Sequence, residues 1–427
     1  MNRDKLIDAI SQDSLIDIFT TLYGNNEETL AMQKERYIRA AKNFEAIYPE
    51  SEDISIFSAP GRTEVCGNHT DHQHGCVLAA AVDLDAIAVV SFHHDHVIRI
   101  QSVGYEQEFI ELDDLSIQPE EKGTSRALVR GIVSQFHDMG VQVDGFNAYI
   151  TSDVLSGSGL SSSAAFEVLI GNIIDRYYNG GQAGAVKIAK MGQYAENKYF
   201  GKESGLMDQM VSSVGGFVHI DFGDTTNPAI EKHECRFEEG RLKLIITDTK
   251  GSHADLTDDY VSIPSEMKLI AAQFGKAFLR DVEEDLFYQS LPRLRTVCPD
   301  RAILRAAHFY SDNARVRKEV EALDRHDFSS FLHLVRESGR SSAELLQNLY
   351  STKKPIEQGI PLALMVSGRL LGDRGAFRVH GGGFAGTIQA FVPEELIWQY
   401  ETTMEALFGE GCCYILNIRS EGGVQVI

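Results

Sequence analysis

The chain of 427 residues is short of positive charge. Lys and Arg total 40 against 62 Asp and Glu, which leaves a formal net charge of −22. An acidic surface repels the phosphates of nucleic acids and the headgroups of anionic membranes. The composition therefore predicts neither nucleic acid nor membrane as a partner. Any phosphate ligand must be attracted locally, by a few placed cations and a metal ion.

Cysteine is scarce as well, and the six cysteines form neither a Cys-x-x-Cys pair nor a disulfide framework. The first five residues are polar and lack the apolar core of a signal peptide. The most apolar long window, residues 76–92, is interrupted by Asp83 and Asp85, which argues against a membrane span. We therefore expect a protein of the reducing cytoplasm.

A Gly/Ser-rich stretch at 157–163 stands between a strand-like segment at 146–150 and an almost entirely apolar segment at 164–174. The pattern predicts a strand, a loop and a buried helix. Free N–H groups and the dipole at a helix N-terminus attract an anion, and glycines let a phosphate approach the backbone. We interpret the stretch as a phosphate cradle. The alternative is a turn that only allows the helix to start.

Two better-known cradles are absent. A Walker loop ends in Gly-Lys-Ser/Thr, and this stretch contains no lysine. A dinucleotide fingerprint has a third glycine where this chain has Ser162. Both of these nucleotide-binding motifs are excluded.

The chain mixes helical and strand-like periodicity, which predicts an α+β fold without internal repeats. Its length favours two domains. Because the composition changes between 223 and 241, we predict domains at 1–230 and 231–427. We expect helices at 4–23, 27–47, 125–139, 185–199, 205–214, 265–350 and 394–408. We expect strands at 54–58, 77–92, 97–112, 146–150, 217–222, 242–247, 377–379, 387–392 and 414–418.

Residues 61–75 form a dense polar loop that can hydrogen-bond a polyhydroxylated ligand from several directions. His69, Asp71, His72 and His74 are close enough in sequence for a metal site to be an alternative. A second histidine-rich cluster at 93–96 lies between strand-like segments, and we interpret it as a solvated turn.

Asp208 stands in an apolar helix start at 205–210. It is either an N-cap or a general base that a nearby cation keeps ionised. Glu196, taken by itself, is a surface charge. The glycines of the turn at 381–386 fit a plain hairpin or the close approach of the backbone to a neighbour.

Together these segments resemble the GHMP small-molecule kinases, and within them the galactokinases. The resemblance covers about residues 50–425. It is carried by motifs at 60–71, 157–168, 205–209 and 381–386. It implies an N-terminal domain like ribosomal protein S5 domain 2, a ferredoxin-like C-terminal domain, and an active site between them.

The resemblance also implies roles for individual residues. Asp208 would take the proton from the sugar C1 hydroxyl, and Arg62 would keep Asp208 ionised. The ligands would be a sugar and ATP, with Mg²⁺ bound by Ser163 and Glu196, in a monomer or weak homodimer. The sugar contacts would be Asn68, His69, Asp71 and Tyr260. The ATP phosphates would be held by Gly157, Ser158, Gly159, Leu160, Ser161, Ser162 and Ser163.

The chain departs from the galactokinase motifs in the sugar-binding region. Glu64 replaces an asparagine, Asn68 replaces the glutamate expected to contact the C6 hydroxyl, and His72 replaces a tyrosine. His380 and Ala385 differ around the third motif. We expect phosphorylation of galactose at C1, with weaker discrimination at C6.

Three other interpretations stay open at this point. The chain could be a kinase for a sugar altered at C6, such as galacturonate or arabinose. It could be a non-catalytic sensor of sugar and ATP, although its Arg62, Asp208 and Ser163 are intact. It could be another GHMP enzyme such as a mevalonate kinase, against which the His69-Thr70-Asp71 element argues.

Overall fold

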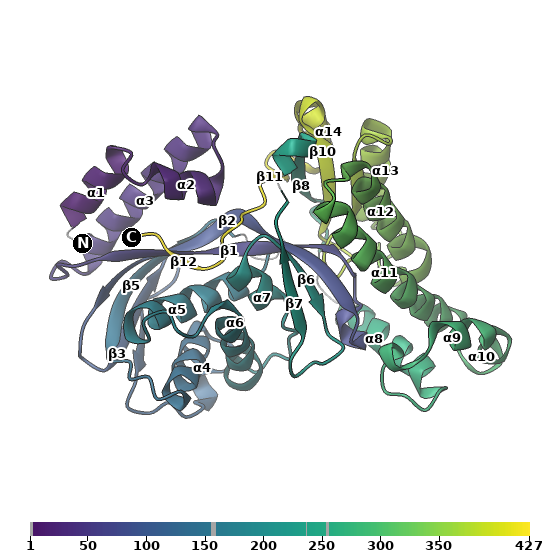
Figure 1. Ribbon diagram of the computed structural model, residues 1–427, viewed down its shortest axis with the longest axis horizontal. Coiled ribbons are helices and arrows are strands. Elements are labelled where there is room, and N and C mark those ends of the chain that lie inside the picture. The colour runs from purple at the N-terminus through teal and green to yellow at the C-terminus, as the bar shows by residue number, and fades with distance from the viewer. Residues whose placement is uncertain (1–2, 155–158, 236, 253–255) are drawn as a thin grey trace.

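A computed structural model gives the structure of residues 3–154, 159–235, 237–252 and 256–427. In these residues the strands form two sheets, with helices on their faces (Figure 1). The α+β prediction is confirmed. None of the helices in the described ranges combines the length and the apolar character needed to cross a bilayer. The six cysteines, which all lie in the described ranges, form no disulfide there.

The first sheet has the order β12-β1-β2-β5-β3-β4, and the hairpin β6–β7 extends it from β2. Within it only β3 and β5 pair in parallel. Its strands are β1 Ser55–Cys66, β2 Cys76–Phe92, β3 Val97–Ser102, β4 Glu108–Glu111, β5 Gly145–Ser152, β6 Phe217–Asp221, β7 Ala229–His233 and β12 Val424–Gln425.

Helices cover both faces of this sheet (Figure 1). The N-terminal helices lie on one face, where they share an apolar core with the side chains of Ile56, Ile87 and Val89. The remaining helices lie on the other face. The first group is α1 Arg3–Ser11, α2 Ile16–Tyr23 and α3 Glu27–Ile47; the second is α4 Ser125–Asp138, α5 Ser162–Tyr178, α6 Ala185–Tyr194 and α7 Met207–Val214.

The second sheet is antiparallel in the order β11-β8-β10-β9. Its strands are β8 Leu242–Asp248, β9 Ala376–Val379, β10 Thr387–Pro393 and β11 Cys413–Leu416. The helices of this part are α8 Thr257–Ala272, α9 Glu284–Gln289, α10 Leu291–Val297, α11 Asp300–Asp324, α12 Phe328–Ser341, α13 Gly359–Leu371 and α14 Ile397–Phe408.

The chain crosses back to the first sheet at its C-terminal end. β12 pairs with β1, and the N and C termini lie on the same side of the molecule (Figure 1). The predicted division at 230/231 falls inside β7, which belongs to the first sheet. The two-domain division stays a prediction.

The helical region expected at 265–350 is divided among α8 to α12 and a π-helical segment, Ser342–Leu346, and three further predicted elements differ from the observed ones. The expected helix at 4–23 is two helices, separated near Asp13, whose φ of +59° is left-handed and ends a helical run. The expected helix at 185–199 ends at Tyr194 and continues as a π-helical segment, Ala195–Phe200, a feature that is frequent at functional sites. The third is β1.

β1 continues to Cys66, well past the expected end at residue 58. Its pairing with β2 shifts register between Pro60 and Arg62. A proline cannot donate to a ladder and is tolerated at such a bulge, which also turns the side chains beside it. The bulge therefore lies directly before Arg62, which pairs with Ala81 where the ladder resumes.

Asp85, which interrupts the apolar window of β2, is fully buried in a polar network. Arg36 and Arg419 contact its carboxylate at 2.6 and 3.0 Å, and Tyr23 donates to it at 2.7 Å. Burial raises its pKa, but the two guanidinium groups outweigh burial and hold the pKa below its usual value. The network joins α2, α3 and the C-terminal segment to β2.

Candidate active site

Arg62 and Asp208 meet although 146 positions separate them in the chain. Arg62 Nε lies 2.8 Å from Asp208 Oδ1, and Arg62 Nη2 lies 2.7 Å from Asp208 Oδ2. This two-pronged arrangement fixes both groups in one plane. The Asp208 side chain remains 34% exposed, so a ligand can still reach its carboxylate.

The Asp208 carboxylate has a third partner, the hydroxyl of Ser161, which donates to Oδ2. Burial raises the pKa of Asp208, but the charge of Arg62 and the bonds from Ser161 and Arg62 outweigh burial and lower the pKa overall. Asp208 is therefore an ionised acceptor at neutral pH. The predicted pairing of this aspartate with a cation is present in the structure.

The described part of the predicted phosphate loop packs directly on β1. Arg62 N donates to Leu160 O at 3.0 Å, and a Cβ added to Gly61 would lie 2.9 Å from the same oxygen. Gly159 and Ser161 have φ of +77° and +60°. Gly157 and Ser158, predicted to bind phosphate, lie outside the described residues. Leu160 itself is fully buried and presents only backbone.

α5 begins immediately after this loop, with Ser162 and Ser163 in its first turn. Ala165 N donates to Ser161 O at 3.2 Å, which closes the first turn. The first-turn N–H groups of a helix and its dipole favour an anion at this position. The arrangement predicted from sequence, a strand followed by a loop and a buried helix, is confirmed in the described residues.

Glu196 is not the surface charge that its sequence position alone suggests. Only 3% of it is exposed, in the π-helical segment after α6. Its carboxylate contacts Lys202 at 2.6 Å, Ser204 Oγ at 2.6 Å and Gln209 Nε2 at 2.9 Å. Lys202 also lowers the pKa of Asp208, so Glu196 and Asp208 share one charged neighbour.

The oxygen atoms around Glu196 fit a hard divalent cation. Gln209 Nε2 also donates to Glu167. Burial raises the pKa of Glu167 well above its usual value, and the negative charge of Glu196 raises it further. Glu167 Oε1 is buried without a hydrogen-bond partner in the described residues. Carboxylate and hydroxyl oxygens are the ligands that Mg²⁺ takes, and Lys202 shows that Glu196 already accommodates a cation. In the described residues Glu196 is bonded to Lys202, Ser204 and Gln209 and not to Ser163.

The turn between β9 and β10 contacts two of the residues predicted to bind the sugar, His69 and Tyr260. His69 Nε2 lies 3.1 Å from Gly382 O, and Tyr260 donates its hydroxyl to Gly383 O at 2.9 Å. A Cβ on Gly382 would lie 2.6 Å from the Tyr260 ring, so only glycine allows this packing. The turn is thus a close approach of backbone to side chains and not a plain hairpin.

His69 and Asp71 have different neighbours: His69 contacts the glycine turn, and Asp71 lies near Gly205. Burial and, to a smaller extent, the charge of His72 lower the pKa of His69 to about 4, so the imidazole of His69 is neutral. A Cβ on Gly205 would lie 3.3 Å from Asp71 Oδ2, which places Asp71 beside the loop leading to Asp208. Within the described residues, this histidine-rich loop brings no three ligand atoms into metal-binding range, so its metal alternative is not supported.

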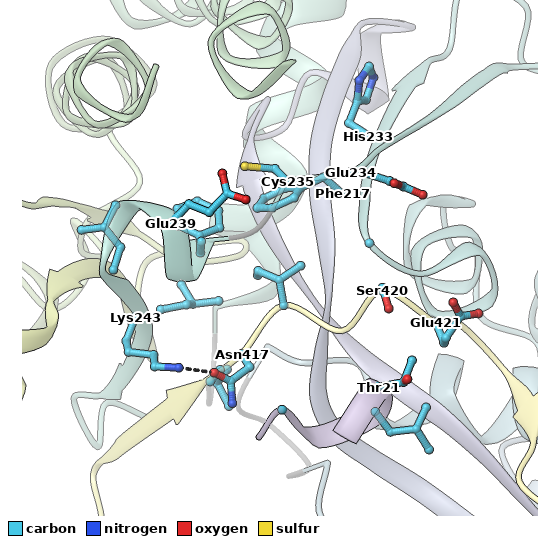
Figure 2. Close-up of a pocket in the computed structure, with 18 of the residues that line it drawn as sticks. Thr21, Phe217, His233, Glu234, Cys235, Glu239, Lys243, Asn417, Ser420 and Glu421 are labelled. Carbon is cyan, nitrogen blue, oxygen red and sulfur yellow. Dashed lines mark hydrogen bonds between the residues drawn. The ribbon is translucent and has the colours of Figure 1, made fainter. Parts of the chain in front are cut away.

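A cavity of about 770 Å³ lies away from these residues, between the two sheets (Figure 2). Its lining includes Thr21, Phe217, Lys243 and Asn417, and none of the predicted site residues. Lys243 bonds to Asn417 across one end of it. The candidate site is therefore identified by its chemistry and not by cavity size.

Two models of protein families match the segments that form this site. Residues 42–92 match the galactokinase galactose-binding signature, and residues 127–216 match the N-terminal domain of GHMP kinases. The first segment holds Arg62, His69 and Asp71, and the second holds the phosphate loop and Asp208.

Solved structures agree with both models. The chain is similar to Lactococcus lactis galactokinase complexed with galactose, at a TM-score of 0.75 and 20% identity over 90% of this chain and 98% of that one. The fold is that of the GHMP kinases. Methanococcus jannaschii mevalonate kinase matches at a TM-score of 0.61 and 16% identity, over 86% and 98% of the two chains.

The GHMP fold brings Glu64 and Asn68, the two main departures from the galactokinase motif, into direct contact. Asn68 Nδ2 lies 2.8 Å from Glu64 Oε1 and 2.8 Å from Gly381 O. Asn348 Nδ2 donates to Asn68 Oδ1 at 2.7 Å, and Asn68 is only 1% exposed. Both amide hydrogens of Asn68 already have acceptors, so Asn68 could donate to a sugar only if one of these bonds opened, and its contact with a sugar stays a prediction.

These two departures bond to each other in this chain. Galactokinases carry asparagine at position 64 and glutamate at position 68, whereas this chain has the carboxylate at 64 and the carboxamide at 68. A carboxylate and an amide can form the same hydrogen bond from either position. In this chain the acid and the amide are in contact, and their order along the chain is the reverse of that in the galactokinase motif.

Sequence analysis did not single out Asn348 or Arg378, which complete this region. Asn348 joins Asn68 to the glycine turn through a bond to Gly382 O at 3.1 Å. Arg378 Nη2 lies 3.5 Å from Glu64 Oε1. Neither residue belongs to a motif, and nothing local to either segment signals its role.

The buried carboxyl of Glu64 gives a pH-dependent prediction. Burial raises its pKa from 4.5 to about 7, against the opposing effect of Arg378 and Asn68. Such a group stabilises the fold below its unfolded pKa, and this contribution is lost as pH rises through the folded value. Glu64→Gln cannot ionise, so its stability relative to the parent should rise between pH 4.5 and 7 by about 1 kcal/mol or more.

Urea denaturation of both proteins across this pH range measures the difference. Glu106→Gln is the control, because Glu106 is exposed and its replacement should leave the pH dependence unchanged. Parallel stability curves for the parent and Glu64→Gln would contradict the prediction.

Proposed function

We propose that the protein is an ATP- and Mg²⁺-dependent kinase that phosphorylates galactose, or a hexose of closely related shape, at the C1 hydroxyl. The observation that carries the proposal is the Arg62–Asp208 pair beside the N-terminus of α5. A galactose-binding signature covers the strand that supplies Arg62. The cytoplasmic location and the monomeric or weakly dimeric state remain predictions.

The geometry suits transfer of the γ-phosphoryl group of ATP. The C1 oxygen would attack the γ-phosphorus as its proton passes to Asp208, and the bond to the β–γ bridging oxygen would break to release ADP. Because such transfer depends mainly on positioning and charge, a base with a lowered pKa is sufficient. Arg62 holds the carboxylate and places a positive charge where the transferred group develops negative charge.

The acidic chain needs a local cation at the phosphates. Ser163 and Glu196 would hold Mg²⁺, which supplies charge neutralisation for the ATP phosphates when bound. The N-terminus of α5 would hold phosphate oxygens on backbone N–H groups. Asp71, His69 and Tyr260 would surround the sugar, between the loop before α7 and the β9–β10 turn.

A kinase for a sugar altered at C6 is the second candidate, and the Glu64–Asn68 exchange favours it. Asn68 would offer a neutral amide where a galactokinase offers a carboxylate. An amide donates as well as accepts and does not repel an anionic C6 group. We therefore propose that galactose is accepted with weaker discrimination at C6. The intact Arg62 and Asp208 argue against a non-catalytic sensor.

Asp208→Asn tests the role of the base. It removes the proton acceptor but keeps a hydrogen-bonding side chain of the same size, so ATP binding should persist. Turnover of galactose should fall by about 10² or more, the usual scale for a general base. Asp258→Asn on α8 is the control, since its side chain is 83% exposed. Turnover within a few-fold of the parent would remove Asp208 from the mechanism.

The metal requirement is tested by Glu196→Gln and Ser163→Ala. We expect activity to be lost in excess EDTA and each variant to need about 10-fold or more Mg²⁺ for half-maximal activity, because each loses an oxygen ligand. Glu203→Gln is the control, as an exposed carboxylate close in sequence. Full activity in EDTA, or an unchanged Mg²⁺ requirement in the double variant, would refute this site.

The contact between Glu64 and Asn68 is tested with Asn68→Glu, Glu64→Asn and the double variant. Asn68→Glu alone would place two buried carboxyl groups in contact, and Glu64→Asn alone would leave Arg378 without its acid. The double variant restores an acid–amide pair. It should therefore be more stable than the two single changes predict, by about 1–3 kcal/mol.

The same variants report on the sugar. The double variant should prefer galactose to 6-deoxygalactose more strongly than the parent does, as measured by the ratio of kcat/KM values. Additive effects of the two changes would show that the pair is not coupled. A parent that already rejects every C6 variant as strongly as the double variant would show that another residue reads C6.

A further inference from the structure

The hairpin β6–β7 places two histidines and a glutamate on one face, at the side of the sheet that contacts α11 (Figure 1). His219 is directly opposite Glu231, and His233 is two residues beyond Glu231 on the same strand. Opposite residues and alternate residues of an antiparallel pair share a face. The three side chains therefore project together because of register alone.

One ligand atom from each residue can be chosen so that all three lie within 4.8 Å of one another. Glu231 Oε2 lies 3.1 Å from His219 Nδ1 and 3.9 Å from His233 Nε2. In the described ranges this is the one group of three such residues with ligand atoms this close. None of the three belongs to the proposed kinase site.

Each of the two imidazoles has one nitrogen with a partner and one nitrogen without a hydrogen-bond partner among the described residues. His233 Nδ1 lies 2.7 Å from Asp324 Oδ1, and His219 Nδ1 faces Glu231. In both rings Nε2 is shielded from solvent and has no hydrogen-bond partner among the described residues. A shielded polar atom without a partner costs free energy, so the Nε2 atom of His233, which lies 3.9 Å from Glu231 Oε2, calls for an explanation.

A bound cation supplies that explanation. An imidazole that donates Nδ1–H to a carboxylate presents the Nε2 lone pair, which is how metal-binding histidines are oriented. His233 and Asp324 have this arrangement. Glu231 is 62% exposed, so an ion can enter from solvent.

We propose that His219, His233 and Glu231 bind a borderline divalent cation of the Zn²⁺ type, with water completing the coordination. Two nitrogen ligands and one carboxylate suit Zn²⁺ or Co²⁺, whereas Mg²⁺ prefers oxygen atoms. Since Asp324 belongs to α11, the ion would fasten the hairpin of the first sheet to a helix of the second part of the chain. The site is structural and independent of catalysis.

The ion would not sit in the cavity described above. Figure 2 shows His233 at the margin of that cavity with its ring turned away from Lys243 and Asn417 at the other end. The cation site therefore lies outside the cavity, on the face of the hairpin towards Asp324.

The test is titration of the full-length, chelator-treated protein with Zn²⁺ in competition with a chromophoric chelator. We expect about one equivalent of Zn²⁺ to bind and to raise the Tm, because a ligand of the native state stabilises it. His219→Gln and His233→Gln should each abolish this equivalent. Asp324→Asn, which alters only the partner of a ligand, should weaken binding by about 10–100-fold.

Glu231→Gln is the variant least able to disturb the fold, because the Glu231 side chain is largely exposed. It should weaken Zn²⁺ binding while leaving Mg²⁺-dependent kinase activity unchanged. His72→Gln and His94→Gln are controls from the two other histidine-rich segments and should keep the bound equivalent. Absence of a bound equivalent in the parent would overturn the proposal. So would an equivalent that survives both histidine changes on the hairpin, or one that is lost in either control.

Discussion

The structure depends on a polar seam where the end of β1 meets the β9–β10 turn. Buried polar groups must find hydrogen-bond partners, and in this seam the partners lie on the opposite sheet. Gln389 donates to Thr63 Oγ1 at 2.7 Å, and His380 Nε2 lies 3.1 Å from the same oxygen. Arg378 reaches the carbonyl of Val65 and the carboxylate of Glu64. A shift of one sheet against the other would strand several of these groups at once.

The seam fixes the site because the candidate residues lie at its two ends. At one end a Cβ on Gly159 would lie 3.1 Å from the His380 ring, so the phosphate loop rests on the second sheet. At the other end Asn68 and His69 bond to the backbone of the glycine turn. His380, which departs from the galactokinase motif, is neutral here because burial lowers its pKa to about 3. It acts in the seam as a hydrogen-bonding group.

Charge at the site is local, as an acidic chain requires. Arg62 compensates Asp208, Lys202 compensates Glu196, and Arg378 faces Glu64. The outcomes differ because burial and the opposing charges are balanced differently. The pKa of Asp208 is lowered, whereas that of Glu64 is raised to about 7. Asp208, the carboxylate proposed as the base, is thus ionised at neutral pH. Glu64, which bonds to Asn68, titrates near neutral pH.

The sequence by itself determined most of the elements and the residue types that the candidate site draws on. Periodicity and glycine positions report local burial and backbone conformation, which is why the strand, loop and helix around 157–174 were predictable. Sequence could not decide that Glu196 is buried, that Glu64 bonds to Asn68, or that Asn348 bonds to Asn68 from 280 residues away. Those contacts, and the meeting of Arg62 with Asp208, were decided only by the tertiary structure. They depend on the register of β1 and on the packing of two sheets, which no local pattern encodes.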